Sequence, residues 1–196
     1  MNKLIVIVGA SGVGKTTLAR ALCAKYDFSI SYEQHDERPF QKLFKQDPKY
    51  VLANQLDYLL YRAGQERELR NNSKPALMDG GLDLDFHGFT QLFHARGWLT
   101  EEEFSLCKRF YQHTRSLLPP PDLVIALNAS EKTISERLAA RNRINIASSE
   151  DTELFNSFVE KWLASIPSSQ LLRLDISDES SDYPQSTIAI LKKLAL

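Results

Sequence analysis

The stretch GASGVGKTTL, which begins at Gly9, follows directly on the apolar run KLIVIV. It fits the pattern GxxxxGK[ST] in full, and this pattern carries meaning between a strand and a helix. In such a loop the glycines let backbone N–H groups turn inward around an anion, and the helix N-terminus adds partial positive charge. The stretch therefore predicts a strand, a phosphate-binding loop and a helix, in that order. The expected loop residues are Gly9, Ala10, Ser11, Gly12, Val13, Gly14, Lys15, Thr16 and Thr17.

Two side chains of this loop carry the expected chemistry. Lys15 is expected to reach the β- and γ-phosphates of a nucleoside triphosphate, and the Thr16 hydroxyl to bind Mg²⁺. A hydroxyl-bound Mg²⁺ also needs a carboxylate, and Asp79 at the end of KPALMD supplies one. The alternatives are a glycine-rich turn without a ligand and a turn aspartate before Gly80. The complete motif in its complete context favours ATP with Mg²⁺.

The composition limits the possible partners. With 196 residues, 43% of them hydrophobic, the chain suits one well-buried domain over residues 1–196 rather than two of full size. A formal net charge of −1 argues against a nucleic-acid surface or an anionic-membrane surface. No run approaches the roughly 20 apolar residues of a membrane span. Cys23 and Cys107 lack the spacing of a metal site, and they fit a reducing cytoplasm. We therefore expect a cytoplasmic protein with a small-molecule partner.

Short apolar runs alternate with longer segments of helical period, which is typical of a parallel sheet whose crossovers are helices. The expected strands are residues 3–8, 28–33, 74–79, 122–127 and 171–176. Helices are expected over 47–70, with Pro48 in the first turn, over 100–118, capped by Thr100 and Glu103, and around 186–196. The prediction is an α/β fold with a five-stranded parallel sheet flanked by helices. In such a sheet, ligands bind at the carboxyl ends of the strands.

Two further features favour transfer of a phosphoryl group to a hydroxyl. Glu33, at the end of the second strand, can orient and deprotonate a hydroxyl acceptor, whereas a phosphate acceptor needs extra cations. In ERLAARNR, Arg137 and Arg141 share a helix face and Arg143 follows. The segment 137–150 therefore predicts a lid that folds over the phosphates and excludes water. The alternatives are a solvated acid for Glu33 and a solvated helix face for the arginines.

The chain resembles the deoxyribonucleoside kinases over nearly its whole length. The resemblance rests on GASGVGKTTL, YEQ, NQLDYLLYRAGQ, PPPDLVIALNASEKTISERLAARNR and FVEKW, which occur in this order. It implies a P-loop kinase fold with an arginine-bearing lid, and an ATP-dependent, Mg²⁺-requiring kinase of a nucleoside or similar small alcohol. It also implies a homodimer formed through the helices that flank the long central one, with ISDESSDY beside the adenine of ATP.

The resemblance also implies roles for particular residues. Glu33 would be the general base for the sugar 5′-hydroxyl. Gln55 and Arg62 would lie beside the base, Asp85 would pair with Arg62, and Phe89 would stack on the base. From the residues alone, Phe89 is equally an ordinary core residue, and Arg62 with Asp85 a structural ion pair. The residues implied in catalysis are Glu33, Lys15, Arg137, Arg141 and Arg143.

The sequence departs from the family pattern around the sugar. The acid-Arg-Ser motif reads DGG, so that Gly80 stands where an arginine would help to hold the acceptor region and Glu33. In the family, a tyrosine and a lid glutamate contact the sugar 3′-hydroxyl, and the resemblance places Phe44 and Ile146 at these two positions. A buried hydroxyl without a partner costs roughly 1–3 kcal/mol, so an ordinary 2′-deoxynucleoside is expected to bind poorly unless other groups substitute. The nearest candidates are Arg38, His35 and Asp83.

Two rival functions follow from these departures. A nucleoside-monophosphate kinase would need extra cations aimed at an acceptor phosphate, and the glycine at position 80 weighs against it. A nucleotide-binding regulatory module without kinase activity would retain the phosphate loop and tolerate the altered sugar site.

Overall fold

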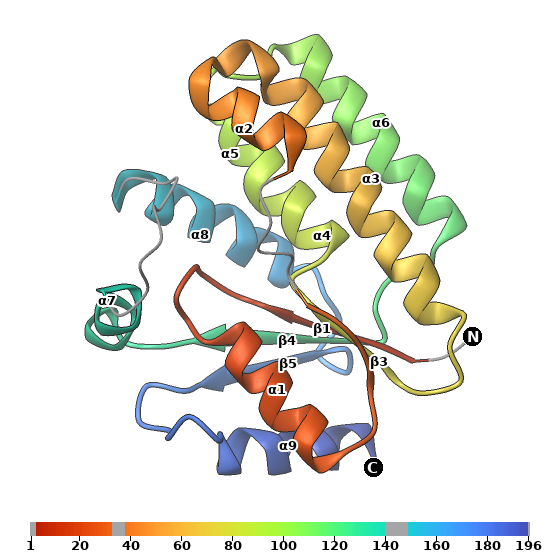
Figure 1. Ribbon diagram of the computed structural model, residues 1–196, viewed down its shortest axis with the longest axis vertical. Coiled ribbons are helices and arrows are strands. Elements are labelled where there is room, and N and C mark those ends of the chain that lie inside the picture. Colours follow the sequence, from red (N-terminus) through yellow and green to blue (C-terminus); the bar gives the residue numbers. More distant parts are fainter. Residues whose placement is uncertain (1–2, 33–37, 140–148, 196) are drawn as a thin grey trace.

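Five parallel strands form one sheet in the order β2-β3-β1-β4-β5, in a computed structural model that describes residues 3–32, 38–139 and 149–195 (Figure 1). The strands are β1 (Leu4–Val8), β2 (Ser29–Ser31), β3 (Ala76–Asp79), β4 (Leu123–Asn128) and β5 (Leu171–Asp175). All five expected strands are present. The central strand β1 pairs with β3 on one side and β4 on the other, and Ile7 lies opposite Asp79. The predicted α/β fold with a five-stranded parallel sheet is confirmed.

Helices cover both faces of the sheet. They are α1 (Lys15–Lys25), α2 (Pro39–Gln46), α3 (Val51–Arg70), α4 (Leu82–Leu84), α5 (Gln91–Ala95), α6 (Glu101–Leu117), α7 (Glu131–Ala139), α8 (Ser149–Leu163) and α9 (Pro184–Leu194). A 3₁₀ turn (Pro48–Tyr50) precedes α3, and a π-helical turn (Asp85–Thr90) lies between α4 and α5. In Figure 1, α1 and α9 lie on one side of the sheet, and α3, α6 and α8 lie on the other.

The alternation of side chains along β1 explains the two cores. Leu4, Val6 and Val8 belong to a cluster with residues of α3, α5 and α8. Ile5 and Ile7 belong to a second cluster with residues of α1 and α9. Because successive strand residues point to opposite faces, a strand covered by helices on both sides must be apolar throughout. This is why the run before the phosphate loop is continuous.

The long helices match the expectations closely. Pro48 begins the 3₁₀ turn, and the α-helical part runs from Val51 to Arg70. The expected capping box is present at α6, where the Thr100 hydroxyl accepts from the Glu103 N–H and the Glu103 carboxylate accepts from the Thr100 N–H. Residues 39–46 and 82–95 are also helical, and the sequence pattern does not predict these two segments. Much of the second segment is buried, so its sequence lacks the polar face that would have revealed a period.

Within the described ranges, no helix is both long and apolar enough to cross a membrane.

Candidate active site

The phosphate loop follows β1 and ends at the first turn of α1, as the sequence predicts. Gly9, Gly12 and Gly14 have φ values of 145°, 80° and 117°, which L side chains rarely adopt. The Lys15 ammonium donates to the carbonyl oxygens of Gly9 and Ala10, each at 3.1 Å. The loop therefore curves back on itself, so that the Lys15 side chain lies against the backbone at the start of the loop.

The two expected Mg²⁺ residues are in direct contact. The Thr16 hydroxyl donates to Oδ2 of Asp79 at 2.5 Å, and Asp79 is fully buried at the carboxyl end of β3. A hydroxyl and a carboxylate at one point are oxygen donors of the kind that Mg²⁺ prefers. These residues fit the metal that the sequence predicts.

Arg137 reaches the phosphate loop from α7. Its Nη1 donates to the Val13 carbonyl, and its guanidinium carbon lies 5.9 Å from the centre of the Tyr183 ring. A Cβ placed on Gly14 would lie 2.4 Å from the Tyr183 hydroxyl and 3.1 Å from Arg137 Nη1. Gly14, the glycine directly before Lys15, therefore leaves room for Tyr183 and Arg137. Arg141 and Arg143 lie outside the described residues, as do residues 140–148 of the predicted lid.

Tyr183 was missed by sequence analysis. It is buried, and its φ of 45° lies in the left-handed region, which is strained for a residue with a side chain. It ends ISDESSDY and directly precedes α9, and no local pattern marks a contact with a loop near the other end of the sequence.

The residues expected around the nucleoside form one hydrogen-bonded group. Arg62 Nε donates to Asp85 Oδ2 at 3.1 Å, and both side chains are buried. Gln55 Nε2 donates to the Asp85 carbonyl at 3.1 Å and to the Thr90 hydroxyl at 2.8 Å. Thr90 in turn donates to the Asp85 carbonyl. The structure thus brings Gln55, Arg62 and Asp85 together across the π-helical turn, and the pair of Arg62 with Asp85 fits both the family resemblance and a structural ion pair.

Phe89 lies on the same π-helical turn. Its side chain is 39% exposed, and its ring centre lies 4.7 Å from that of Phe155 on α8. Gly88 allows this approach, because a Cβ there would lie 2.4 Å from Phe155. Phe89 is therefore packed on one side and accessible on the other.

The residues expected around the sugar do not form one such group within the described part of the chain. Phe44 is buried against Phe93 and Trp98, so its ring belongs to the core. Arg38 donates two hydrogen bonds of 2.6 Å to Asp57 and its guanidinium carbon lies 4.4 Å from the Tyr61 ring centre. Glu33, His35 and Ile146 lie outside the described residues.

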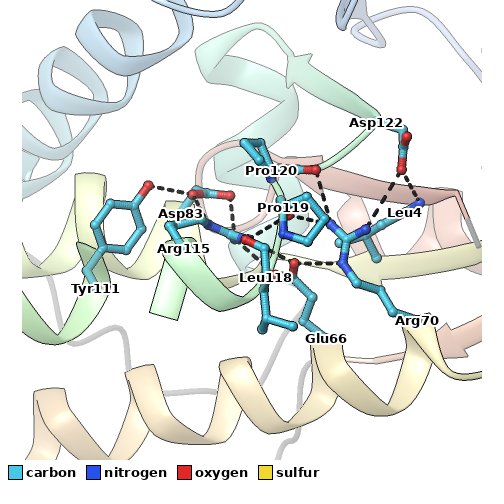
Figure 2. A network of polar contacts seen from close by, with 10 residues as sticks. All are labelled: Leu4, Glu66, Arg70, Asp83, Tyr111, Arg115, Leu118, Pro119, Pro120 and Asp122. Carbon is cyan, nitrogen blue, oxygen red and sulfur yellow. Dashed lines mark hydrogen bonds and ion pairs between the residues drawn. The ribbon is translucent and has the colours of Figure 1, made fainter. Parts of the chain in front are cut away.

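The suggestion that Asp83 substitutes at the sugar site is wrong. Its carboxylate accepts hydrogen bonds from Tyr111 and from two nitrogens of Arg115 (Figure 2). Arg115 also forms two hydrogen bonds with Glu66 on α3, at 2.8 and 2.9 Å. Asp83 is thus committed to a buried polar network that ties α4 to α3 and α6, a partnership that no sequence spacing indicates.

This network shifts the pKa of its members in directions that follow from burial and charge. Burial, the Asp83 charge and its hydrogen bond raise the pKa of Tyr111. Burial lowers the pKa of the Arg115 guanidinium, but the negative charges of Asp83 and Glu66 raise it by more, so that the pKa lies above its ordinary value. Burial lowers the pKa of His87, which contacts the Tyr111 hydroxyl at 3.2 Å.

Gln65 is a second residue that sequence analysis missed. It accepts a hydrogen bond from Arg62 Nη1 at 3.1 Å, and its amide nitrogen donates to Ser31 and Tyr61. Its position three residues after Arg62 is the one available signal, because side chains at this spacing meet on a helix.

Comparisons with known proteins agree with this geometry. The family model described as deoxynucleoside kinase matches residues 5–195. The deoxyadenosine/deoxycytidine kinase of Bacillus subtilis (strain 168) is 22% identical over 182 residues, which cover 90% of this chain and 84% of that protein. The deoxyguanosine kinase of the same organism is 27% identical over 141 residues, 71% of this chain and 67% of that protein. The structure of a deoxyadenosine kinase from M. mycoides with bound dATP superposes with a TM-score of 0.78 at 23% identity, covering 98% of this chain and 100% of that one.

Proposed function

Because the chain belongs to the deoxynucleoside kinase family, and is therefore a phosphotransferase that acts on deoxynucleosides, we propose that it transfers the γ-phosphoryl group of ATP to the sugar 5′-hydroxyl. The observation that carries this proposal is the position of Asp79. Its carboxylate contacts Thr16 of the phosphate loop, and its backbone carbonyl accepts from Arg62 of the nucleoside group. One residue thus joins the phosphate end of the site to the acceptor end.

The phosphate end has these proposed roles. The Lys15 ammonium neutralises charge on the β- and γ-phosphates, and Arg137, Arg141 and Arg143 add cations from the other side. Thr16 and Asp79 bind Mg²⁺, which when present offsets phosphate charge. The contact of Thr16 with Asp79 supports the metal assignment.

The acceptor end has a different composition. Gln55, Arg62 and Asp85 offer amide, guanidinium and carboxylate groups to the nucleoside, while the accessible face of Phe89 is suited to stacking on a base. Glu33 takes the proton of the 5′-hydroxyl as general base. This assignment of Glu33 rests on its position after β2 in the sequence and on the family resemblance.

A coupled assay of ADP formation tests the proposal over deoxyadenosine, deoxyguanosine, deoxycytidine and thymidine. At least one deoxynucleoside should raise turnover well above the rate with ATP alone. If none does while ATP still binds, the regulatory module without kinase activity becomes the better function. If deoxynucleoside monophosphates are the better acceptors, the chain is a nucleoside-monophosphate kinase.

We also propose that residues 1–196 form one cytoplasmic domain that assembles as a homodimer. Helices α3 and α6 lie side by side (Figure 1), and their outer surfaces carry exposed Leu60, Leu106 and Leu117. Burial of apolar side chains drives association, so this face suits a second copy. Sedimentation at micromolar concentration should give a dimer, and a monomer for Leu60→Glu.

A further inference from the structure

Arg62 lies at the carboxyl end of β3, beside the backbone of Asp79 and Gly80. Its Nη1 donates to the Asp79 carbonyl at 3.3 Å, and a Cβ placed on Gly80 would lie 3.2 Å from its Nη2. Gly80 has a φ of 76°, in the region that favours glycine. The absence of a side chain at position 80 therefore leaves room for the guanidinium. A buried cation stands next to the residue whose carboxylate contacts Thr16 of the phosphate loop.

Gln65 holds this guanidinium toward β2. Its Oε1 accepts from Arg62 Nη1 at 3.1 Å, and its Nε2 donates to the hydroxyls of Ser31 and Tyr61, each at 2.5 Å. Because an arginine can only donate, the amide oxygen must face Arg62 and the amide nitrogen must face the hydroxyls. Ser31 is the last residue of β2. Gln65 thus links Arg62 to the carboxyl ends of both β2 and β3, where ligands of such sheets bind.

We propose that Arg62 acts on the reacting hydroxyl of the deoxynucleoside rather than on its base, and that Gln65 is a positioning residue that holds Arg62 there. The inference rests on the proposed function. In the proposed transfer, the hydroxyl oxygen bonds to the γ-phosphorus, and the bond between the γ-phosphorus and the oxygen of ADP breaks. ADP leaves with the electrons of that bond, and the hydroxyl proton passes to the proposed general base. The attacking oxygen gains negative charge as its proton departs, and a fixed guanidinium donor stabilises that charge. Arg62 thus supplies the cation that is missing at position 80, where glycine stands in place of the arginine of the family pattern.

The hydrogen bonds of Arg62 explain why it can act in this way. Asp85 binds its Nε, the Asp79 carbonyl and Gln65 bind its Nη1, and its Nη2 lies against Gly80. Donors that are fixed before the reaction cost no reorganisation when charge develops. Loss of one support, such as Gln65, should let the guanidinium shift, and a misplacement of about 1 Å can cost on the order of 10²-fold in rate.

The first test compares Arg62→Lys with the wild type on the two best acceptors that differ in base. The lysine keeps the charge but cannot reproduce the planar arrangement of donors. We expect kcat to fall about 10²-fold, by the same factor for both bases, with the KM for ATP nearly unchanged. A loss that lies in the nucleoside KM and differs between the bases would mean that Arg62 reads the base, and the inference would fail.

The second test uses two substitutions of Gln65, which is only partly buried and so tolerates change. Gln65→Met removes every hydrogen bond and should lower kcat by about 10- to 100-fold. Gln65→Glu should restore kcat, because its carboxylate accepts from Arg62 and the hydroxyls of Ser31 and Tyr61 can turn to donate to it. In the Arg62→Lys background, Gln65→Met should add little, since residues that act as one unit are not additive.

A matched control is Arg67→Met, which removes an exposed arginine from the same helix and should leave kcat unchanged. Thermal unfolding of every variant separates folding from catalysis. If Arg62→Lys does not fold, the Gln65 pair decides alone. A Gln65→Met protein with normal kcat and only a lower melting temperature would make Gln65 merely structural. A wild type without deoxynucleoside-stimulated turnover would instead remove the proposed function and this inference together.

Discussion

In the proposed reaction, transfer depends on charges that single residues of the phosphate loop and of the acceptor end carry. The Lys15 ammonium lies across the loop, 3.1 Å from two of its carbonyl oxygens. Thr16 of the same loop contacts Asp79 at the end of β3. Substitutions at this scale change charge or proton transfer at one point, so their effects should appear in kinetics before they appear in stability.

Lys15→Ala should abolish transfer and weaken ATP binding. In the proposed reaction the lysine neutralises charge shared by the β- and γ-phosphates as the bond between them breaks, so its loss should raise the barrier and remove a ground-state contact. Turnover with the best deoxynucleoside and ATP binding by calorimetry check the prediction together. Near-normal turnover of this variant would contradict the assignment of the loop.

Glu33→Gln tests the proposed base most directly. The amide keeps the size of the side chain but cannot take a proton, so kcat should fall about 10²- to 10⁴-fold with ATP affinity nearly unchanged. With glycine at position 80, the orientation of Glu33 depends on other groups, and we expect the low end of this range. A variant that turns over at the wild-type rate would show that Glu33 is a solvated acid.

Short elements place the acceptor end. The π-helical turn Asp85–Thr90 contains both Asp85, which pairs with Arg62, and Phe89. Gln55 and Thr90 both donate to the carbonyl of Asp85, so side chains stabilise a backbone form that is rare and often found at functional sites. The turn packs on α8 through the gap left by Gly88. The position of Phe89 therefore depends on the contact between two elements.

Gly88→Ala should disturb this contact. The new methyl group would lie 2.4 Å from the buried ring of Phe155, so one of the two elements must move. We expect a loss of about 1–3 kcal/mol in the free energy of unfolding, as in other overpacked cores, with a raised KM for the deoxynucleoside.

Gly64→Ala is the matched control, because within the described part of the chain a Cβ at that position of α3 would meet nothing within 4 Å beyond its chain neighbours and the nearby backbone of its own helix. It should stabilise the protein by about 0.4–1 kcal/mol and leave the KM unchanged. Urea unfolding and initial rates distinguish the two variants. Equal stability of both would show that Phe155 yields without cost.

At the scale of the whole molecule, one buried polar network connects the helices behind the acceptor end. Arg115 of α6 bridges Asp83 and Glu66, and Arg70 of α3 donates to Glu66 and to the carbonyls of Pro119 and Pro120 before β4 (Figure 2). Removing one member of such a network leaves a buried charge unpaired, which is strongly destabilising. The network thereby fixes α3, α4 and α6 relative to the sheet.

The network also makes stability depend on pH. Burial lowers the pKa of His87 below its ordinary value of 6.5, so below that pH the unfolded chain binds a proton that the folded chain does not. The contribution of His87 is therefore fully present above the unfolded pKa and is lost as the pH falls toward the folded one. Between pH 7.5 and pH 5, the wild type should lose more free energy of unfolding than His87→Asn.

Urea unfolding at several pH values gives both slopes. Identical slopes would contradict the burial of a neutral imidazole.

At alkaline pH the dependence of stability on pH has the opposite sign. The pKa of Tyr111 is raised above its ordinary value of 10.0, so the stability that Tyr111 contributes is present below that pH and is lost as the pH rises above it. Tyr111→Phe should flatten that loss.

Much of the fold and part of the site follow from the sequence alone. Short apolar runs predict the five strands, the glycine pattern predicts the phosphate loop, and Thr100 with Glu103 predicts the start of α6. The meeting of Asp79 with Thr16 also followed, because the carboxyl ends of parallel strands share one edge. These features depend on residues close in sequence, or on a rule that holds for every such sheet.

Only the tertiary structure decided the partners of the polar side chains. From the sequence, Asp83 was a candidate contact of the sugar, but in the folded chain its carboxylate binds Arg115. Residue spacing did not predict that Gln65 would hydrogen-bond to Arg62 or that Tyr183 would lie against Gly14. A local pattern records which face of an element is buried. It does not record which of several donors and acceptors will meet there, because that choice is made by the packing of segments far apart in the chain, where each buried polar group must find a partner.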